Sequence, residues 1–347
     1  MPIEPRNAPI RGGTLPGQAD AHAHAGVRDL HADWLKAAAI VGVVCIHAGT
    51  PVQDLFRFGV PVFIGLWAYY LEKALARRPK ETHGAYLLQR LVELGVAYLA
   101  WTLLYIEKFY EGRLDTTPLH TVVGGWFGGY GWSGQYYFVI LFQLTLLFPL
   151  LRRWIADAPT LPVIAAGVAL NVAAGYWLFE HRLISAVGDR LFIYWIPYVA
   201  MGIALARGEL ARRPGLAIVG GLLLLAAPLE SALFTEHSAY LSLTVTLASL
   251  LLLASAVSAD RARMAVPAQP PGFVGRAVAL VGRHTFAIYV ANVGMLEVCK
   301  ATGFTAFAES HAGDWGLIAV VAVALAGGLA IGWLLQALGL GVLVGKR

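Results

Sequence analysis

Charged residues are scarce in this chain: only 14% of its 347 residues are Asp, Glu, Lys or Arg, whereas 58% are hydrophobic. Soluble domains carry about 25% charged residues. A composition this poor in charge excludes a soluble enzyme held by a single anchor. It predicts an all-α, polytopic integral membrane protein whose surroundings include the lipid bilayer.

Cysteine and the common catalytic motifs are also scarce. The chain has two cysteines, Cys45 and Cys299, both inside apolar runs, so neither a disulfide framework nor a cysteine-based metal site is expected. It contains no His-Glu-x-x-His, Walker, Gly-x-Ser-x-Gly or Rossmann pattern, and no internal repeat. We therefore expect no bound metal and no nucleic-acid partner.

Long apolar runs, in contrast, are abundant. Ten of them are long enough to cross a bilayer, if modest tilt is allowed. With the N-terminus inside, nineteen of the 26 Lys and Arg residues fall in the inner set of loops and six in the outer set, which obeys the positive-inside rule. This layout predicts about ten transmembrane helices with both termini cytoplasmic. The predicted spans are 33–50, 55–75, 86–106, 135–151, 160–178, 191–206, 214–232, 238–258, 278–299 and 314–341.

The first 32 residues differ from the rest of the chain. They lack the apolar core of 7–15 residues that a signal peptide needs, and their polar and small residues follow no period. We expect residues 1–32 to be a mobile cytoplasmic tail and residues 33–347 to form one transmembrane domain.

The first apolar segment carries two ionisable residues on one stripe. Lys36 and His47 are eleven residues apart, so on an α-helix they lie within roughly 20° of each other and about 16 Å apart along the axis. Ionisable residues inside a membrane segment usually mark a functional site. Each also has a structural explanation. His47 can bond a neighbouring helix, and Lys36 can snorkel to the membrane surface or pair with Asp33, which can also cap the helix.

The predicted inner loop 72–90 is basic and contains Arg77, Arg78 and Arg90. Such a loop beside the inner leaflet obeys the positive-inside rule. Its guanidinium groups can also hold the phosphates of a cytosolic cofactor. The composition of the loop alone leaves both interpretations open.

Residues 124–134 contain six glycines and four aromatic residues, Trp126 and Trp132 among them. One interpretation is an aromatic belt at the outer membrane surface. The other is a flexible loop whose rings stack on sugar faces. The sequence favours neither.

The run from Asp33 to His47 resembles the first-helix signature of the membrane acyltransferase-3 family, which has Asp-x-Leu-Arg, ten residues and then His. Softer patterns of the same family follow in the same order. They are Val60-Pro61-Val62-Phe63, Tyr86 to Arg90, Gln135-Tyr136-Tyr137-Phe138 with Gln143 and Pro149, Tyr194 to Gly202, and Gly282-Arg283-His284-Thr285 with Tyr289. Together they cover most of residues 30–300.

The chain departs from the family's patterns at several positions. The arginine of the first-helix signature is Lys36 here, which keeps the charge but loses the bidentate fork. Ser-Gly after the second motif appears as Trp67-Ala68, the second arginine of an inner Arg-x-x-Arg pair falls near Glu93, and a late histidine aligns with Asn292. These differences concern the donor-binding details and the identity of the acyl group.

The resemblance implies a ten-span O-acyltransferase of the cell membrane. Such enzymes move an acetyl or succinyl group from a cytosolic acyl-CoA, acetyl-CoA foremost, to a hydroxyl of a cell-surface or exported polysaccharide. The subgroup nearest in pattern is attached to exopolysaccharide modification and export.

From the residues and the resemblance together we expect a catalytic set of His47, Lys36 and Asp33, with His47 as general base on a glycan hydroxyl. We expect Lys36 and Arg90 to hold anionic parts of the CoA, helped by Arg77 and Arg78. The candidates for glycan binding are Trp126, Trp132, Gln135, Tyr136 and Asn292, of which Gln135 or Asn292 can donate to the developing oxyanion.

Two other functions fit the same sequence. A transporter or flippase of a glycan or lipid-linked sugar would explain acidic residues in apolar segments, such as Glu230 and Glu297. A non-catalytic subunit would scaffold a polysaccharide synthase or export complex and would tolerate substitution of His47.

Overall fold

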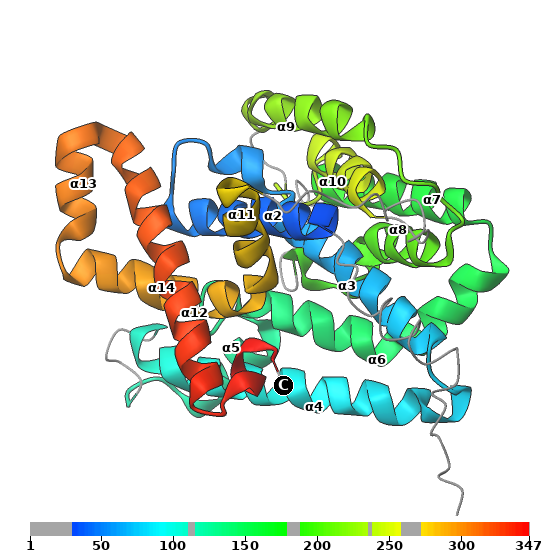
Figure 1. Ribbon diagram of the computed structural model, residues 1–347, viewed down its shortest axis with the longest axis horizontal. Helices are drawn as coiled ribbons and strands as arrows, with labels where there is room; N and C mark the ends of the chain where they lie inside the picture. The colour runs from blue at the N-terminus through cyan, green and yellow to red at the C-terminus, as the bar shows by residue number, and fades with distance from the viewer. Residues whose placement is uncertain (1–29, 110–114, 179–187, 235–237, 258–271, 347) are drawn as a thin grey trace, which may run out of the picture.

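The computed structural model describes residues 30–109, 115–178, 188–234, 238–257 and 272–346, and residues 1–29 of the predicted tail lie outside this set. Every regular element in the described residues is helical, which confirms the all-α class (Figure 1). The α-helices are α2 (Leu30–Ala48), α3 (Gly59–Ala76), α4 (His83–Phe109), α5 (Leu119–Gly128), α6 (Gln135–Asp157), α7 (Thr160–Val172), α8 (Ile196–Arg207), α9 (Leu216–Leu233), α10 (Leu243–Ala256), α11 (Phe273–Arg283), α12 (Thr285–Ala301), α13 (Phe304–Ala312) and α14 (Leu317–Ala337). Shorter helical turns include η1 (Gln53–Phe56), η4 (Gly188–Arg190), η5 (Phe192–Trp195) and η8 (Gly341–Val344).

Six helical segments within the described residues are long and apolar enough to cross a membrane. They are His31–Ala48, Lys80–Ile106, Gln135–Asp157, Thr160–Trp177, Leu216–Leu233 and Phe304–Ala337. Two shorter apolar segments, Phe192–Arg207 and Leu243–Ala256, coincide with two further predicted spans. The chain is therefore multi-pass. The predicted number of ten and the placement of the termini stay predictions.

The predicted span 278–299 is interrupted in the structure. Helix α11 ends at Arg283, His284 takes a non-helical conformation with φ −110°, and α12 begins at Thr285. Close packing accounts for the break, because a Cβ at Gly282 would lie 2.1 Å from the backbone oxygen of Asp33. Helix α11 rests directly on the start of α2, so the chain turns before it continues as α12.

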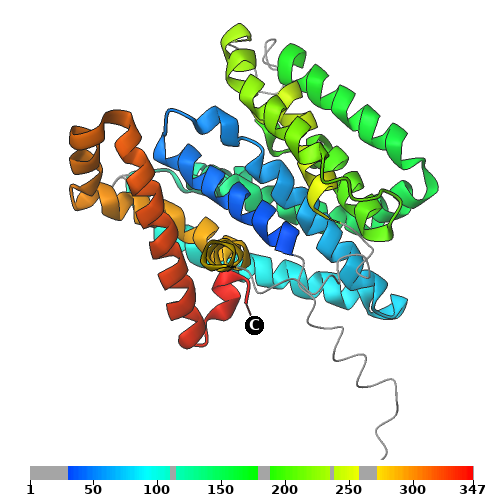
Figure 2. The same cartoon turned by 45° about the horizontal axis from the view of Figure 1, so that its top comes forward.

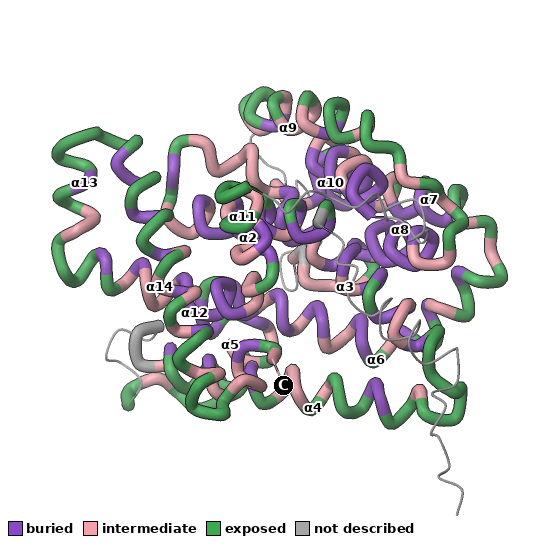
Figure 3. The backbone as a smooth tube through the Cα atoms, viewed as in Figure 1, coloured by how far each residue is buried: buried purple, intermediate pink, exposed green. Residues whose placement is uncertain are grey.

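Small residues bring α3 and α8 into close contact at the centre of the bundle. A Cβ on Gly202 would lie 2.2 Å from the backbone oxygen of Gly65, so the two backbones touch there. Small residues at helix interfaces are how membrane helices gain van der Waals contact without a hydrophobic driving force. Burial is most continuous along α8 and the inner face of α3, whereas α9 is largely exposed (Figure 3).

The helices form groups around α2 and α3 (Figure 2). Helices α4 and α6 lie on one side of this pair, and α7 to α10 lie on the other. Helices α12 and α14 pack against each other and against α2. We refer to the part of the bundle where α2 terminates as the His47 end, and to the part where α2 begins as the Lys36 end.

Candidate functional site

Helix α2 carries the three residues of the predicted catalytic set. Near its start, Lys36 Nζ lies 2.5 Å from Asp33 Oδ1, and Asp33 is only 4% exposed. The ammonium of Lys36 also lies 5.5 Å from the ring centre of Tyr70 on α3. Lys36 is therefore held between the buried carboxylate of Asp33 and the ring of Tyr70 on α3. This is the pairing with Asp33 that the sequence suggested.

At the other end of α2, His47 points at α12. Its Nδ1 lies 2.6 Å from Oδ1 of Asn292, which is completely buried. The amide nitrogen of Asn292 donates to the backbone carbonyl of Tyr289. Since that carbonyl can only accept, the amide oxygen is the atom that faces His47.

This orientation fixes the tautomer of His47. An amide oxygen can only accept, so a proton must be on Nδ1 of His47. In the neutral ring the second nitrogen, Nε2, then carries the lone pair. No described residue forms a hydrogen bond with Nε2. The ring thus has a fixed orientation and one lone-pair nitrogen to which no described residue bonds.

The position of Asn292 is itself fixed from two helices. Tyr289, one turn earlier on α12, donates its hydroxyl to the backbone oxygen of Gly134 at the start of α6. Tyr105 on α4 donates to the backbone oxygen of Val290 at 2.7 Å and accepts from the backbone nitrogen of Gly294 at 3.1 Å. These contacts hold α12 against α4 and α6, so the position of Asn292 relative to His47 is fixed.

A cavity of about 440 Å³ lies between α3, α4, α6, α12 and η8. Its volume is within the range of small-molecule sites, which is about 300–1,000 Å³. Its aromatic and polar lining residues are Trp67, Tyr70, Tyr86, Arg90, Glu93, Tyr137, Thr145 and Phe286. Lys36 is not one of the lining residues, but its ammonium lies against the ring of Tyr70, which is one.

His47 does not line the cavity, but one aromatic pair connects the two. Tyr137 lines the cavity, and its ring lies 5.1 Å from the ring of Tyr289. Tyr289 in turn supplies the carbonyl that orients Asn292. The cavity wall and the His47–Asn292 pair are therefore neighbours.

Two of the three predicted cofactor-binding arginines gather around one ring of the cavity wall. Arg90 donates from Nε to the hydroxyl of Tyr86 at 3.1 Å and pairs with Glu93 at 3.1 Å. Arg78 stacks over the same ring with its Cζ 4.0 Å from the centre. Arg77 is exposed at the C-terminal end of α3 and is not part of this group.

The predicted glycine-rich loop is partly helical. Leu119–Gly128 form α5, which ends where Gly129 takes a left-handed conformation with φ 72°. The backbone oxygen of Trp126, a half-buried residue of α5, accepts the hydroxyl proton of Tyr98 at 2.6 Å. Of the two open interpretations, the flexible loop does not hold for residues 124–128, which are helical, and the aromatic belt stays a prediction.

Trp132 and Gln135 are components of the core. Trp132 is 4% exposed and packs 5.2 Å from the ring of Tyr105. The amide of Gln135 donates to Thr102 at 2.9 Å and to Tyr98 at 3.1 Å, and its oxygen accepts from the backbone of Gly131. Both side chains are surrounded by protein groups. Their roles in glycan binding stay predictions.

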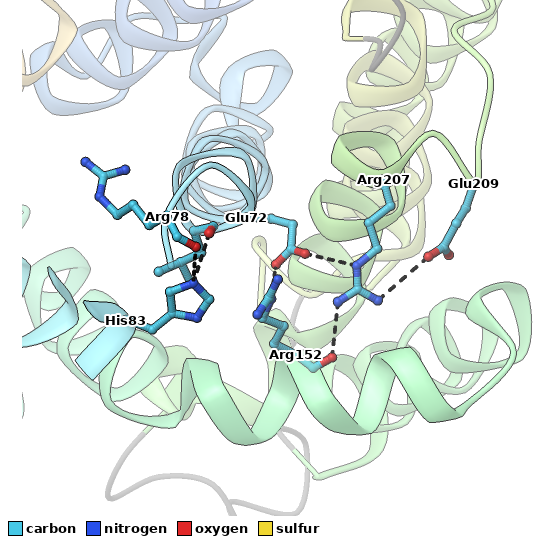
Figure 4. A network of polar contacts seen from close by, with 7 residues as sticks. Glu72, Arg78, His83, Arg152, Arg207 and Glu209 are labelled. Atoms are coloured by element: carbon cyan, nitrogen blue, oxygen red, sulfur yellow. Dashed lines mark hydrogen bonds and ion pairs between the residues drawn. The ribbon is translucent and has the colours of Figure 1, made fainter. Parts of the chain in front are cut away.

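Sequence reasoning missed a buried ionic cluster at the Lys36 end, formed by Glu72, Arg152 and Arg207 (Figure 4). Glu72 is 3% exposed and accepts from Arg152 Nε at 2.6 Å and from Arg207 Nε at 3.0 Å. Arg207 also donates to the backbone oxygen of Arg152 at 3.3 Å. A glutamate within an apolar helix was the available signal, but partners 80 and 135 residues away cannot be found from spacing.

The two acidic residues that suggested a transporter have local partners. Glu230 accepts from the backbone nitrogens of Leu243 at 2.8 Å and Thr244 at 3.0 Å, so it caps the start of α10. Glu297 is 30% exposed and pairs with Lys300 at 3.3 Å near the end of α12. Neither contact requires a transport role. In the described part of the chain, no group of three or more His, Cys, Asp or Glu residues could hold a metal ion.

Comparison with known proteins identifies a family. The family model described as the acyltransferase domain of the acyltransferase-3 family matches residues 30–337, which include the whole of the candidate site except the C-terminal turn η8. No curated protein and no solved structure matches the chain.

Proposed function

The chain belongs to the acyltransferase-3 family, and from that premise we propose that it transfers an acyl group from acyl-CoA to a hydroxyl of a glycan, with His47 as the general base. The observation that carries the proposal is the hydrogen bond of 2.6 Å between His47 Nδ1 and Asn292 Oδ1. It leaves Nε2 as a proton acceptor inside a helical bundle. A general base must have such an unbonded nitrogen within reach of its substrate.

In the proposed reaction, Nε2 of His47 takes the proton of a glycan hydroxyl as its oxygen attacks the thioester carbonyl. The new carbon–oxygen bond forms, the carbon–sulfur bond breaks, and the proton passes from His47 to the departing CoA sulfur. General base catalysis typically contributes about 10²–10⁴-fold to the rate. Asn292 is a positioning residue in this scheme, because its amide oxygen contacts His47.

We place the donor in the cavity between α3, α4 and α6, with its acyl end toward Tyr137. Arg90 in the cavity wall, and Lys36 against the lining residue Tyr70, supply positive charge for anionic groups of CoA. Asp33 positions Lys36. Lys36 lies eleven residues from His47 along α2, about 16 Å, so its role is donor binding and not proton transfer.

The charge distribution supports one orientation of the chain. The Lys36 end carries Arg77, Arg78, Arg152 and Arg207, and the positive-inside rule favours the cytosolic side, where acyl-CoA is made, for such an end. The His47 end then faces outward, where a cell-surface or exported polysaccharide is the acceptor. The proposed location is the cell membrane.

Purified protein in lipid nanodiscs tests this function directly. The protein is incubated with radiolabelled acetyl-CoA or succinyl-CoA and a panel of polysaccharides, and CoA release and glycan labelling are measured. We expect CoA release and glycan labelling in equal amounts. Neither product, together with glycan uptake by proteoliposomes in response to an imposed ion gradient, would contradict the proposal and favour a transporter.

A further inference from the structure

A second group of polar residues gathers at the His47 end, outside the site described above. It consists of Arg57, Arg190, Tyr130, Tyr136 and Tyr240, which we call the arginine–tyrosine patch. Arg57 directly follows η1, Arg190 ends η4, Tyr130 and Tyr136 flank the start of α6, and Tyr240 precedes α10. Residues from four separate parts of the chain thus meet in one place.

The tyrosine rings of this patch contact the two guanidinium groups, and two of the tyrosines contact each other. The hydroxyls of Tyr136 and Tyr240 are 3.0 Å apart and their ring centres are 6.0 Å apart. Arg57 lies over Tyr240 at 5.5 Å, whereas Arg190 lies over Tyr130 at 3.8 Å and over Tyr136 at 5.9 Å. The two guanidinium groups therefore flank a pair of hydrogen-bonded tyrosines.

Each of the two arginines has an N–H donor that is not used by the described residues. Nε of Arg57 and Nε of Arg190 are both buried donors without a hydrogen-bond partner among the described residues. Among the side chains that the structure describes, no carboxylate pairs with Arg190, and its one side-chain donation there goes to the hydroxyl of Tyr130 at 3.0 Å. Asp54 approaches Nε of Arg57 only to 3.7 Å. Buried donors of this kind are costly unless something accepts from them.

The patch is next to the proposed base. The turn η1 packs on α2, where a Cβ at Gly42 would lie 2.8 Å from Cβ of Phe56. Helix α2 ends at Ala48, one residue after His47, and Arg57 directly follows η1, so both residues lie at this end of the contact between α2 and η1. A glycan with one hydroxyl at His47 would therefore have a neighbouring sugar near the patch.

We propose that the arginine–tyrosine patch binds an anionic substituent of the acceptor glycan, which makes the acceptor an acidic polysaccharide. Guanidinium groups bind carboxylates and phosphates through charge-assisted hydrogen bonds, and the tyrosine rings offer faces for the sugar that carries the charge. The anion is either the carboxylate of a uronic acid or a phosphate on the glycan. The inference rests on the proposed function, because it takes His47 as the point of transfer.

Direct binding to the protein in nanodiscs tests the patch without relying on turnover. The probes are a glucuronic-acid-containing tetrasaccharide, its carboxyl-reduced neutral counterpart and a phosphorylated tetrasaccharide of the same backbone, measured by isothermal titration calorimetry. We expect at least one anionic probe to bind about tenfold tighter than the neutral probe. The probe that binds tighter, carboxylate or phosphate, then identifies the anion. Equal binding of all three, or no binding of any, would overturn the inference.

Variants then assign the preference to these residues. Arg190→Gln and Arg57→Gln should each reduce the preference for the anionic probe to about twofold or less, and Arg190→Lys should keep part of it. Lys300→Gln removes the same charge from an exposed side chain at the end of α12 and should leave the preference unchanged. An equal loss in Lys300→Gln would show general electrostatic attraction and contradict a specific site.

The same preparation separates this inference from the proposed function. Acyl transfer to the neutral glycan with no preference for the anionic one would overturn the patch and leave the acyltransferase intact. Tight binding of the anionic probe with neither CoA release nor glycan labelling would support the patch and contradict the proposed acyltransferase function. Displacement of the anionic probe by CoA would show that the patch binds the donor, which also contradicts the inference.

Discussion

Two polar centres inside the bundle, one at the Lys36 end and one at the His47 end, differ in how many of their polar atoms have a hydrogen-bond or ion-pair partner. At the Lys36 end, both carboxylate oxygens of Glu72 are paired, one with Arg152 and the other with Arg207. At the His47 end, the ring of His47 has one nitrogen bonded to Asn292 and one unbonded within the described residues. A fully paired cluster of this kind holds helices together, whereas a fixed ring with a lone pair to spare is suited to chemistry.

The helices that each centre joins support the same distinction. Glu72, Arg152 and Arg207 belong to α3, α6 and α8, so their ion pairs join three helices that are far apart in the chain. His47 and Asn292 join only α2 and α12. Loss of the ionic cluster should therefore affect stability first, and loss of the His47 pair should affect activity first.

The largest expected effect is on catalysis. His47→Ala should lower the rate of acyl transfer about 10²–10⁴-fold, because the general base is removed. Its melting temperature should change little, since one hydrogen bond between two helices is lost. His120→Ala, at an exposed position on α5, is the matched control and should keep full activity. Undiminished transfer by His47→Ala would place the chemistry elsewhere.

The next effect is on stability. Glu72→Gln leaves two arginines without their carboxylate, and breaking a buried ion pair costs about 3–5 kcal/mol. Since the side chains of Arg152 and Arg207 are 28% and 22% exposed, we expect the lower end of that range. Thermal unfolding in detergent, followed by tryptophan fluorescence, should show a fall in Tm of about 5 °C or more.

Glu209 provides the control for this comparison. It is 38% exposed and lies 3.7 Å from Arg207 at the edge of the same cluster. Exposed pairs contribute about 0–1 kcal/mol, so Glu209→Gln should barely change Tm. If Glu72→Gln abolished acyl transfer at an unchanged Tm, the cluster would belong to the active site and the distinction between the two centres would fail.

A smaller effect on the rate is expected at Asn292. Asn292→Leu keeps the shape of the side chain but removes the acceptor for His47 Nδ1, and it should lower kcat about ten- to hundredfold with little change in KM. Asn292→Asp keeps an oxygen acceptor and should retain more activity than Asn292→Leu. Equal loss in both variants, or a change confined to KM for the glycan, would show that Asn292 binds substrate instead of positioning His47.

Much of the fold was predictable from the sequence, because long apolar runs and the scarcity of charge specify membrane helices directly. The break at His284 was not, since it depends on Gly282 touching the backbone of Asp33, a residue about 250 positions earlier. The helix Leu119–Gly128 was missed because its glycines are typical of loops. In both cases tertiary packing outweighs the local pattern.

The site was predictable where it depends on one helix. Eleven residues between Lys36 and His47 define a stripe on α2 from the sequence alone, and the family signature drew attention to it. The partners of that stripe come from α3 and α12, so Tyr70 beside Lys36 could not be assigned. Asn292 was expected as a glycan ligand. Its contact with His47 spans 245 positions and became visible only in the folded chain.

The role of His47 as general base requires its proton to be on Nδ1. Nitrogen-15 NMR of histidine-labelled protein at about pH 8, where an unperturbed histidine is neutral, measures this directly, with the His47 signals assigned by their absence in His47→Ala. We predict a neutral ring with the proton on Nδ1 and a deprotonated Nε2. A proton on Nε2 would contradict this mechanism, because the nitrogen that does not face Asn292 could then not accept the hydroxyl proton.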